Sequence, residues 1–158
     1  FEAGTQNINA IPTLKTAIDF MEILRDKELR DEMREVEECI ERSFASLRMT
    51  EGVRMTEGVR MTEGVRKAGG VKIYGVPRGT ESKVPIYSFT VQGAHHEDLA
   101  QILDKMGIAV RSGQMCAEPL MDRFGVTGML RVSLAPYNTV EEVNHFFKSL
   151  DKAIGMLV

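Results

Sequence analysis

The sequence has little of several features that would point to particular classes of protein. Its 158 residues include only two cysteines, too few for a disulfide framework, so we expect a reducing compartment and a cytoplasmic location. It also has no basic surplus, because 20 Lys and Arg stand against 23 Asp and Glu, for a net charge of -3. Proteins that bind a phosphate backbone need positive charge gathered on one face, so we predict no nucleic-acid partner.

Long apolar runs are lacking as well. No stretch approaches the roughly 18 residues that a membrane-spanning helix needs, and no basic stretch followed by an apolar core has the pattern of a signal peptide. We therefore expect no membrane partner. The chain starts at Phe1 without an initiator Met, so we expect it to be processed or cut from something longer. With 43% hydrophobic and 27% charged residues, it has the composition of an ordinary globular domain.

Apolar residues at helical spacing predict two helices before Arg48, the first beginning near Pro12. The apolar positions are Leu14, Ala17, Ile18, Met21 and Leu24 in the first helix, and Leu29, Met33, Val36, Ile40, Phe44 and Leu47 in the second. We expect both helices to pack on the domain that follows, with their apolar stripes turned inward.

A hexapeptide repeat follows, in which RMTEGV occurs three times, from Arg48, Arg54 and Arg60. Each copy carries a glycine, which costs roughly 1 kcal/mol inside a helix. A six-residue period also turns the chain by about 600° on a helix, so successive copies would not share a face. We therefore predict that residues 48–66 are an insertion outside the core. Deleting two copies should change stability by less than about 1 kcal/mol, since loop-closure entropy depends only weakly on length.

From residue 67 onward the pattern alternates between strands and helices. Short β-rich runs predict strands at residues 71–76, 86–91, 108–110 and 130–135. A helix after His95 has its apolar stripe at Leu99, Ile102, Leu103 and Met106, and Gly107 ends it. The closing helix begins at the capping box of Thr139 and Glu142, and its inner stripe is predicted to be Val143, Phe146, Phe147, Leu150, Ile154 and Leu157. This order predicts an α/β fold of the α+β type, a small, mainly antiparallel sheet with helices on one face.

Residues 111–119 (RSGQMCAEP) are the segment richest in potential chemistry. A loop cysteine with a cation nearby can be held as a thiolate, so Cys116 is either a nucleophile or a free thiol that only packs. Arg131 lies in the polar register of an apolar strand, where it either grips a carboxylate or forms a surface salt bridge. Cys39, within an amphipathic helix, is interpreted as structural. We predict no metal site, because the His95-His96 pair has no further ligand at suitable spacing and is better placed at a helix start.

Three segments together resemble the C-terminal part of type II cysteine desulfurases. They are residues 1–5 (FEAGT), 107–120 (GIAVRSGQMCAEPL) and 130–139 (LRVSLAPYNT). These enzymes use pyridoxal phosphate, belong to the class V aminotransferase group and are close to selenocysteine lyases. The resemblance covers nearly the whole chain outside the repeat. It implies that residues 67–158 are the C-terminal small domain of a fold-type I pyridoxal-phosphate enzyme, and that residues 1–47 continue from a large domain missing from this chain.

The resemblance also implies roles for individual residues. Cys116 would be the nucleophile that takes sulfur from substrate cysteine, leaving alanine and an enzyme persulfide. Arg131 would grip the substrate carboxylate, and Arg111 would place its charge beside the active loop. Thr5, with Gly4 beside it, would reach the cofactor phosphate of the neighbouring subunit in a homodimer.

Two departures from the family pattern are visible. Gln114 and Met115 stand where many relatives have histidine, and Met115 cannot carry a proton. The chain also has no His-Lys pair, although the family's cofactor lysine follows a histidine in the large domain. We therefore expect a fragment of the enzyme that is inactive alone.

One alternative is a stand-alone sulfur-carrier or interaction module that kept Cys116 and lost the cofactor, and another is a structural α/β domain with an inert thiol. The enzyme fragment is distinguished from both by whether a large domain with a His-Lys pair precedes Phe1 in the parent reading frame. The sequence does not distinguish cysteine from selenocysteine as substrate, and it does not name the sulfur-acceptor protein.

Overall fold

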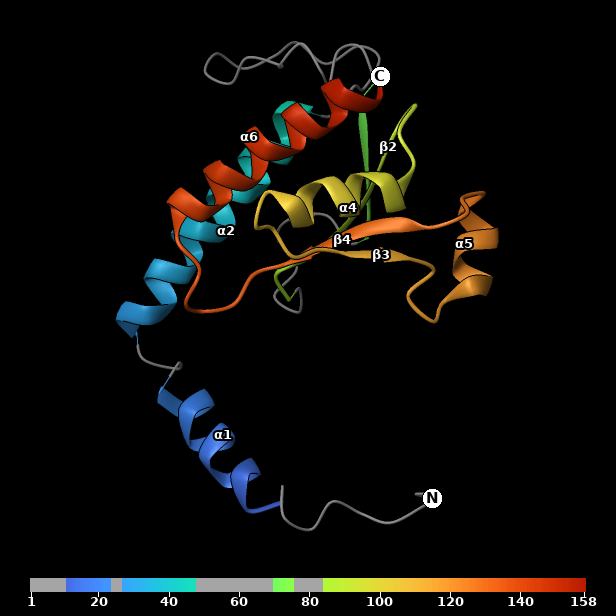
Figure 1. The fold of residues 1–158 in the computed structure, drawn as a ribbon. Coiled ribbons are helices and arrows are strands. Elements are labelled where there is room, and N and C mark those ends of the chain that lie inside the picture. The colour runs from blue at the N-terminus through green and yellow to red at the C-terminus, as the bar shows by residue number, and fades with distance from the viewer. Residues whose placement is uncertain (1–10, 24–26, 48–69, 76–83) are drawn as a thin grey trace.

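The structure, a computed structural model, describes residues 11–23, 27–47, 70–75 and 84–158. Its centre is a four-stranded antiparallel sheet with the strand order β1-β2-β4-β3 (Figure 1). The strands are β1 (Val71–Tyr74), β2 (Ile86–Val91), β3 (Arg111–Gly113) and β4 (Met129–Ser133). The prediction that β1, β2 and β4 share one sheet is confirmed, and so is the α/β fold class.

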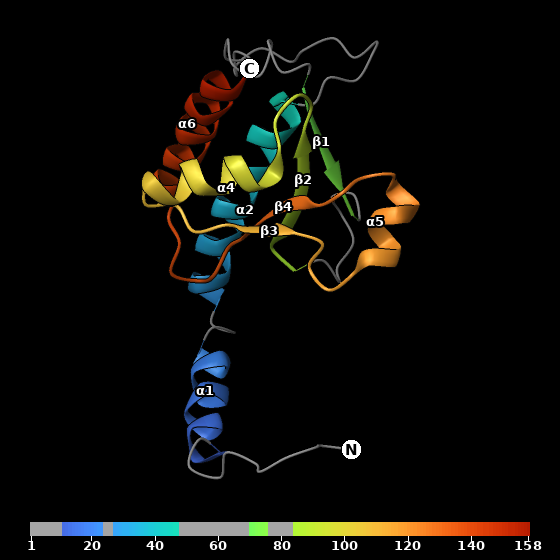
Figure 2. The same cartoon turned by 45° about the vertical axis from the view of Figure 1, so that its right-hand side comes forward.

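Three helices cover one face of this sheet: α2 (Lys27–Leu47), α4 (His96–Lys105) and α6 (Val140–Leu157) (Figures 1 and 2). Alternate strand residues point to this face, which is why Tyr87, Phe89 and Val91 of β2 are buried while the residues between them are more exposed. The main core cluster of the described residues therefore lies on this side of the sheet. A further helix, α5 (Glu118–Phe124), lies away from this cluster and is described with the site.

Phe44 of α2 lies at the centre of the core and is 1% exposed. Its ring centroid lies 5.2 Å from that of Phe89 and 5.0 Å from that of Phe147, with the rings of Tyr87 and Phe146 also in contact. Tilted and edge-to-face pairs of this kind add to the gain from apolar burial. The aromatic cluster thereby joins α2 and α6 to the sheet.

The closing helix α6 begins as predicted, with a complete capping box between Thr139 and Glu142. Hydrogen bonds from the Asn138 side chain and the Thr139 backbone lower the pKa of Glu142. The predicted inner stripe is buried or half-buried up to Ile154. The prediction is wrong for Leu157, which is 36% exposed, because the last turn of α6 extends past the core.

The strand expected at residues 108–110 was also placed wrongly, since β3 begins only at Arg111. Gly107, with a left-handed φ of 78°, reverses the chain after α4. The N–H of Ile108 then donates to the carbonyl of Leu103 at 3.0 Å, so it completes the helix end and does not pair in the sheet. Part of the segment predicted as a loop, residues 111–113, is therefore a strand.

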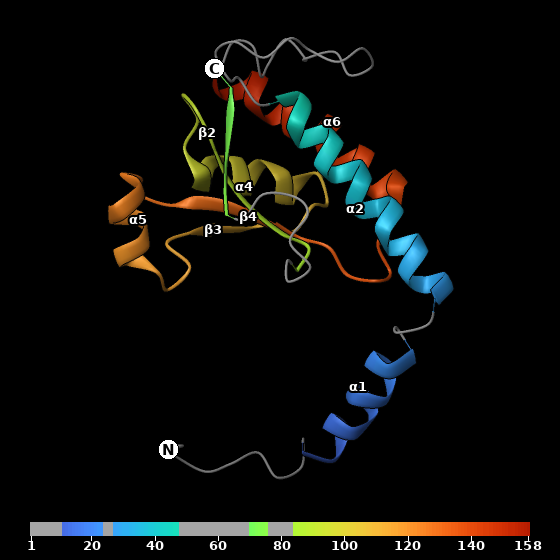
Figure 3. The same ribbon diagram turned by 180° about the vertical axis from the view of Figure 1, so that it is seen from behind.

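The first helix, α1 (Ile11–Ile23), forms as predicted but does not pack on the domain. It extends away from the sheet and the other helices (Figures 1 and 3). Its apolar side chains are exposed, at 59% for Leu14, 50% for Ile18 and 61% for Met21. The expectation that both N-terminal helices pack is therefore wrong for α1, and it holds for α2 through Val36, Ile40 and Phe44.

Some predictions concern residues outside the described part of the chain. Residues 48–66, predicted as an insertion, lie there, as do Gly4 and Thr5. What was expected of them stays a prediction.

Candidate active site

A row of four paired residues crosses the sheet on the face opposite the helical core. The strand register places Tyr74 opposite Ser88, Ser88 opposite Arg131, and Arg131 opposite Arg111. Directly paired residues in antiparallel strands have side chains on the same face, so these four form the floor of one surface. We call this surface the open face, defined by Tyr74, Ser88, Arg131 and Arg111.

Two arginines at neighbouring positions make this surface electropositive. Like charges directly opposite one another destabilise a sheet. Within the described ranges of the chain, neither guanidinium forms an ion pair that would offset this repulsion. The Nε of Arg131 is buried and has no hydrogen-bond partner there. A buried donor without a partner is costly, so the arrangement suits an anion that accepts hydrogen bonds from both guanidinium groups.

Cys116 lies in a tight turn just after β3. The N–H of Ala117 donates to the carbonyl of Gln114 at 3.0 Å, which closes the turn. Its two central residues, Met115 and Cys116, have positive φ angles of 58° and 59°. Residues with a Cβ adopt this conformation at a cost of roughly 1–2 kcal/mol each, so the surrounding structure has to hold the turn in place.

Arg111 connects Cys116 to the open face. Its Nη2 donates to Cys116 Sγ at 3.8 Å, and Cys116 is exposed. An accessible cysteine in contact with a guanidinium is the kind of surroundings in which reactive cysteines are found. The structure therefore brings together three of the predicted site residues, Cys116, Arg111 and Arg131. The other two, Gly4 and Thr5, lie outside the residues that the structure describes.

Helix α5 forms one end of the open face. The ring of Phe124 lies 5.0 Å from that of Tyr74, so α5 packs on the side of the sheet away from the core. Met121 and Met129 are buried but do not belong to the main core cluster, which agrees with a second, smaller contact under α5. The Gln114 side chain donates to Glu118 at 3.3 Å across the base of the turn.

Sequence reasoning missed Tyr74 and Ser88 as members of the open face, and it placed Arg111 in a loop. The alternation along β1 and β2 assigns Tyr74 and Ser88 to the polar face, but it does not say which strand lies beside Arg131. The position of Arg111 depends on pairing with a strand 20 residues away in sequence, at Arg131, and no local pattern contains that information.

Other candidate groups have structural roles. Cys39 is half-buried against the core, as predicted, and His95 caps α4 by accepting from the N–H of Glu97 at 3.4 Å. Among the described residues, no three His, Cys, Asp or Glu side chains gather as metal ligands do, and no helix is long and apolar enough to cross a membrane. A cavity of about 450 Å³ opens between α2, α6 and the end of β4, but neither Cys116 nor the two arginines line it.

The chain is similar to known proteins along its whole length. The profile of the class-V aminotransferase family matches residues 56–146. A probable cysteine desulfurase of Vibrio cholerae is 31% identical over 99% of this chain and 33% of its own length. Cysteine desulfurase CsdA of Escherichia coli is 45% identical over 46% of the chain and 18% of its own length.

Solved structures give the same result. The crystal structure of CsdA from Escherichia coli, in an S-sulfonic acid form, matches all of this chain and 33% of its own, with a TM-score of 0.68 and 28% identity. The apo cysteine desulfurase of Thermococcus onnurineus matches 99% of this chain and 34% of its own, with a TM-score of 0.69 and 32% identity. The chain thus spans about a third of the length of the relatives it matches.

Proposed function

Because the chain belongs to the class-V aminotransferase family, we propose that it supplies the sulfur-accepting part of a pyridoxal-phosphate-dependent cysteine desulfurase. In this proposal Cys116 takes the sulfur of cysteine, and Arg131 and Arg111 hold the substrate. The relatives that match nearly the whole chain are themselves described as probable cysteine desulfurases. Since this chain spans a third of their length, we place it within a longer enzyme.

The observation that carries the proposal is the contact between Arg111 and Cys116 beside Arg131, whose Nε has no hydrogen-bond partner among the described residues. Cysteine as a substrate has a carboxylate and a sulfur atom only a few bonds apart. A site for it therefore needs a guanidinium pair and a nucleophilic thiol close to each other, in the same pocket. A sulfur carrier without substrate binding would have no need for the two arginines.

The residues of the open face fit the substrate side of such a site. Arg131 Nε is a buried donor without a partner in the described structure, and a carboxylate would satisfy it. The cofactor, when bound, supplies an electron sink at the substrate carbon. Gly4 and Thr5 would reach its phosphate, as the family resemblance implies. The lysine that would bind the cofactor covalently would come from outside this chain.

The sulfur transfer itself uses groups of this chain. Arg111 Nη2 contacts Cys116 Sγ and helps to orient it, and Cys116 Sγ attacks the sulfur of the bound substrate. An S–S bond forms and the C–S bond breaks. Its electron pair stays on the substrate carbon, which takes up a proton and leaves as alanine. The persulfide remains on Cys116, which is exposed and can pass sulfur to the thiol of an acceptor protein.

The test is a chimera in which this chain replaces the matching third of Escherichia coli CsdA. With cysteine and pyridoxal phosphate, the chimera should release alanine and gain one sulfur atom on Cys116, measured by peptide mass spectrometry. The isolated chain should release no alanine beyond that produced by free cofactor. Cys116→Ala should abolish the persulfide, while the matched control Cys39→Ala should leave it.

Two outcomes would contradict the proposal. One is a persulfide on Cys39 in place of Cys116. The other is a chimera that binds the cofactor, as its visible absorbance shows, but forms no persulfide. Turnover by the isolated 158-residue chain would contradict the placement within a longer enzyme and leave the assignment of Cys116 intact.

A further inference from the structure

His96 is a buried imidazole that the sulfur-transfer chemistry does not use. It is the first residue of α4, is 8% exposed, and its ring centroid lies 4.1 Å from that of His95. Burial, followed by the neighbouring His95, lowers the pKa of His96, while Glu97 and Asp98 on the same helix oppose this shift. Burial thus favours the neutral form of the ring, and the role argued here rests on how the ring packs.

The edge of this ring lies against the backbone at Gly128, just before β4. A Cβ at Gly128 would lie 2.5 Å from His96 Nε2 and 2.7 Å from its Cε1, far inside contact distance. It would also lie 3.0 Å from the carbonyl carbon of Gly113. The space that a side chain at Gly128 would need is thus taken up by the imidazole and bordered by the end of β3.

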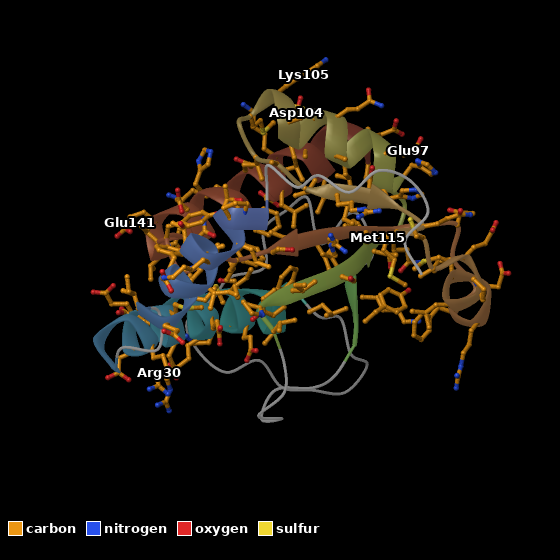
Figure 4. All side chains as sticks on the ribbon, turned by 90° about the horizontal axis from the view of Figure 1, so that it is seen from below. Arg30, Glu97, Asp104, Lys105, Met115 and Glu141 are labelled. Atoms are coloured by element: carbon orange, nitrogen blue, oxygen red, sulfur yellow. The ribbon has the colours of Figure 1, made fainter. Side chains whose placement is uncertain are left out.

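That end of β3 is where the turn with Cys116 begins. Gly113 pairs with Met129, and the turn closes from Gln114 to Ala117 directly afterwards. Figures 1 and 3 place the start of α4 at the same end of the sheet as the turn and α5, and Figure 4 shows Glu97 and Met115 at that end. A packed side chain at this point fixes the position from which the strained turn starts.

We propose that His96 is a positioning residue for Cys116, acting through its contact with Gly128 and the adjoining end of β3. Two consecutive residues at positive φ stay in that conformation only when the surrounding structure holds them. The exposed hydrogen bond from Gln114 to Glu118 adds little by itself. A buried ring against a glycine backbone is the more rigid support. That this positioning serves catalysis rests on the proposed function. The contact between His96 and Gly128 does not depend on it.

The experiment uses the full 158-residue chain with Cys39→Ala, so that Cys116 is its only thiol. The alkylation rates of Cys116 by iodoacetate and by iodoacetamide are measured, and their ratio is taken. Both reagents react with the thiolate, but only iodoacetate carries a carboxylate that Arg111 and Arg131 attract. The intrinsic reactivity of Cys116 affects both rates equally and drops out of their ratio. The ratio therefore reports where the thiol lies relative to the two arginines. Attraction between the carboxylate of iodoacetate and one arginine at about 4 Å in water is worth about a fivefold change in rate, which is the size of effect to expect.

His96→Ala should lower the iodoacetate-to-iodoacetamide ratio about 2- to 5-fold, as Arg111→Gln does, because the turn moves away from the arginines. Gly128→Ala should lower it as well, since its Cβ meets the imidazole. Combining the two substitutions removes the clash and refills part of the space, so the double variant should return to within about twofold of the parent. His145→Ala, at an exposed histidine of α6, is the matched control and should leave the ratio unchanged.

An unchanged ratio in a folded His96→Ala chain, checked by circular dichroism, would overturn the proposal. If His96→Ala does not fold, Gly128→Ala and His96→Gln decide the question by the same ratio. If the effects of the two single substitutions simply add in the double variant, they do not act through one shared contact, which also overturns the proposal. None of these results depends on persulfide formation, so failure here and failure of the proposed function are distinguishable.

Discussion

Arg111 and Arg131 are direct partners in the register between β3 and β4, so two guanidinium groups share one position on the open face. Neither has a carboxylate partner in the described part of the chain. A protein that needed only stability would not gain from this pairing. The two arginines are instead placed to bind an anion. Their mutual repulsion lowers the stability of the folded chain, as functional sites often do.

Replacing Arg131 by Ala should weaken binding of the substrate carboxylate, because its two-point contact is lost. Hydrogen bonds to a charged group contribute about 1.5–3 kcal/mol, so KM for cysteine in the chimera with CsdA should rise at least tenfold. Arg123→Ala, at an exposed arginine of α5, is the control and should leave KM unchanged. Steady-state alanine release measures both, and equal KM values for the two variants would contradict the assignment of Arg131.

Replacing Arg111 by Gln should stabilise the folded chain while it removes the contact with Cys116. The like-charge pair costs about 0.2–1 kcal/mol, and the free energy of unfolding should rise by a similar amount in urea titrations at low salt. The gain should shrink near 1 M salt, where the screening length is about 3 Å. A loss of stability at low salt would mean that the contact with Cys116 outweighs the repulsion between the two arginines, contrary to this prediction.

Phe44→Ala should be among the most destabilising substitutions in the chain, because this ring touches four others and is 1% exposed. Removing a buried phenylalanine typically costs 3–5 kcal/mol, through lost burial and the cavity that remains. Phe20→Ala on α1, where the ring is 52% exposed, is the size-matched control and should cost less than about 0.5 kcal/mol. Denaturant unfolding of both variants gives the comparison.

Stability should fall as the pH drops below about 6.5, the ordinary pKa of histidine, partly because of His96. Its pKa is lowered in the folded chain, chiefly by burial, so in this range the unfolded chain binds more protons than the folded one. His96→Gln should remove this contribution and flatten the loss. Unfolding free energies measured one pH unit above and below 6.5 test this, and equal slopes for parent and variant would refute it.

Much of the fold follows from local pattern. Apolar spacing predicted the core residues Val36, Ile40 and Phe44 of α2 and nearly all of the inner stripe of α6. The Thr139 capping box was readable because its residues lie close together in the sequence. Local pattern gave wrong predictions at the ends of helices and strands. It extended the stripe to Leu157, and it placed a strand at residues 108–110, where the N–H of Ile108 instead completes a helix end. Spacing also predicted α1 correctly but could not say that α1 would lie away from the core.

The sequence by itself determined the kinds of element, their order, and the residues from which a site could be built, because periodicity and side-chain chemistry are local properties. It could point to Cys116 and Arg131 separately. Only the tertiary structure decided that Arg111 lies between them, pairing with one and touching the other. It also decided that Gly128 lies against His96. These contacts depend on which strands become neighbours and in what register, and that choice is made by burying one common core and not by any single segment.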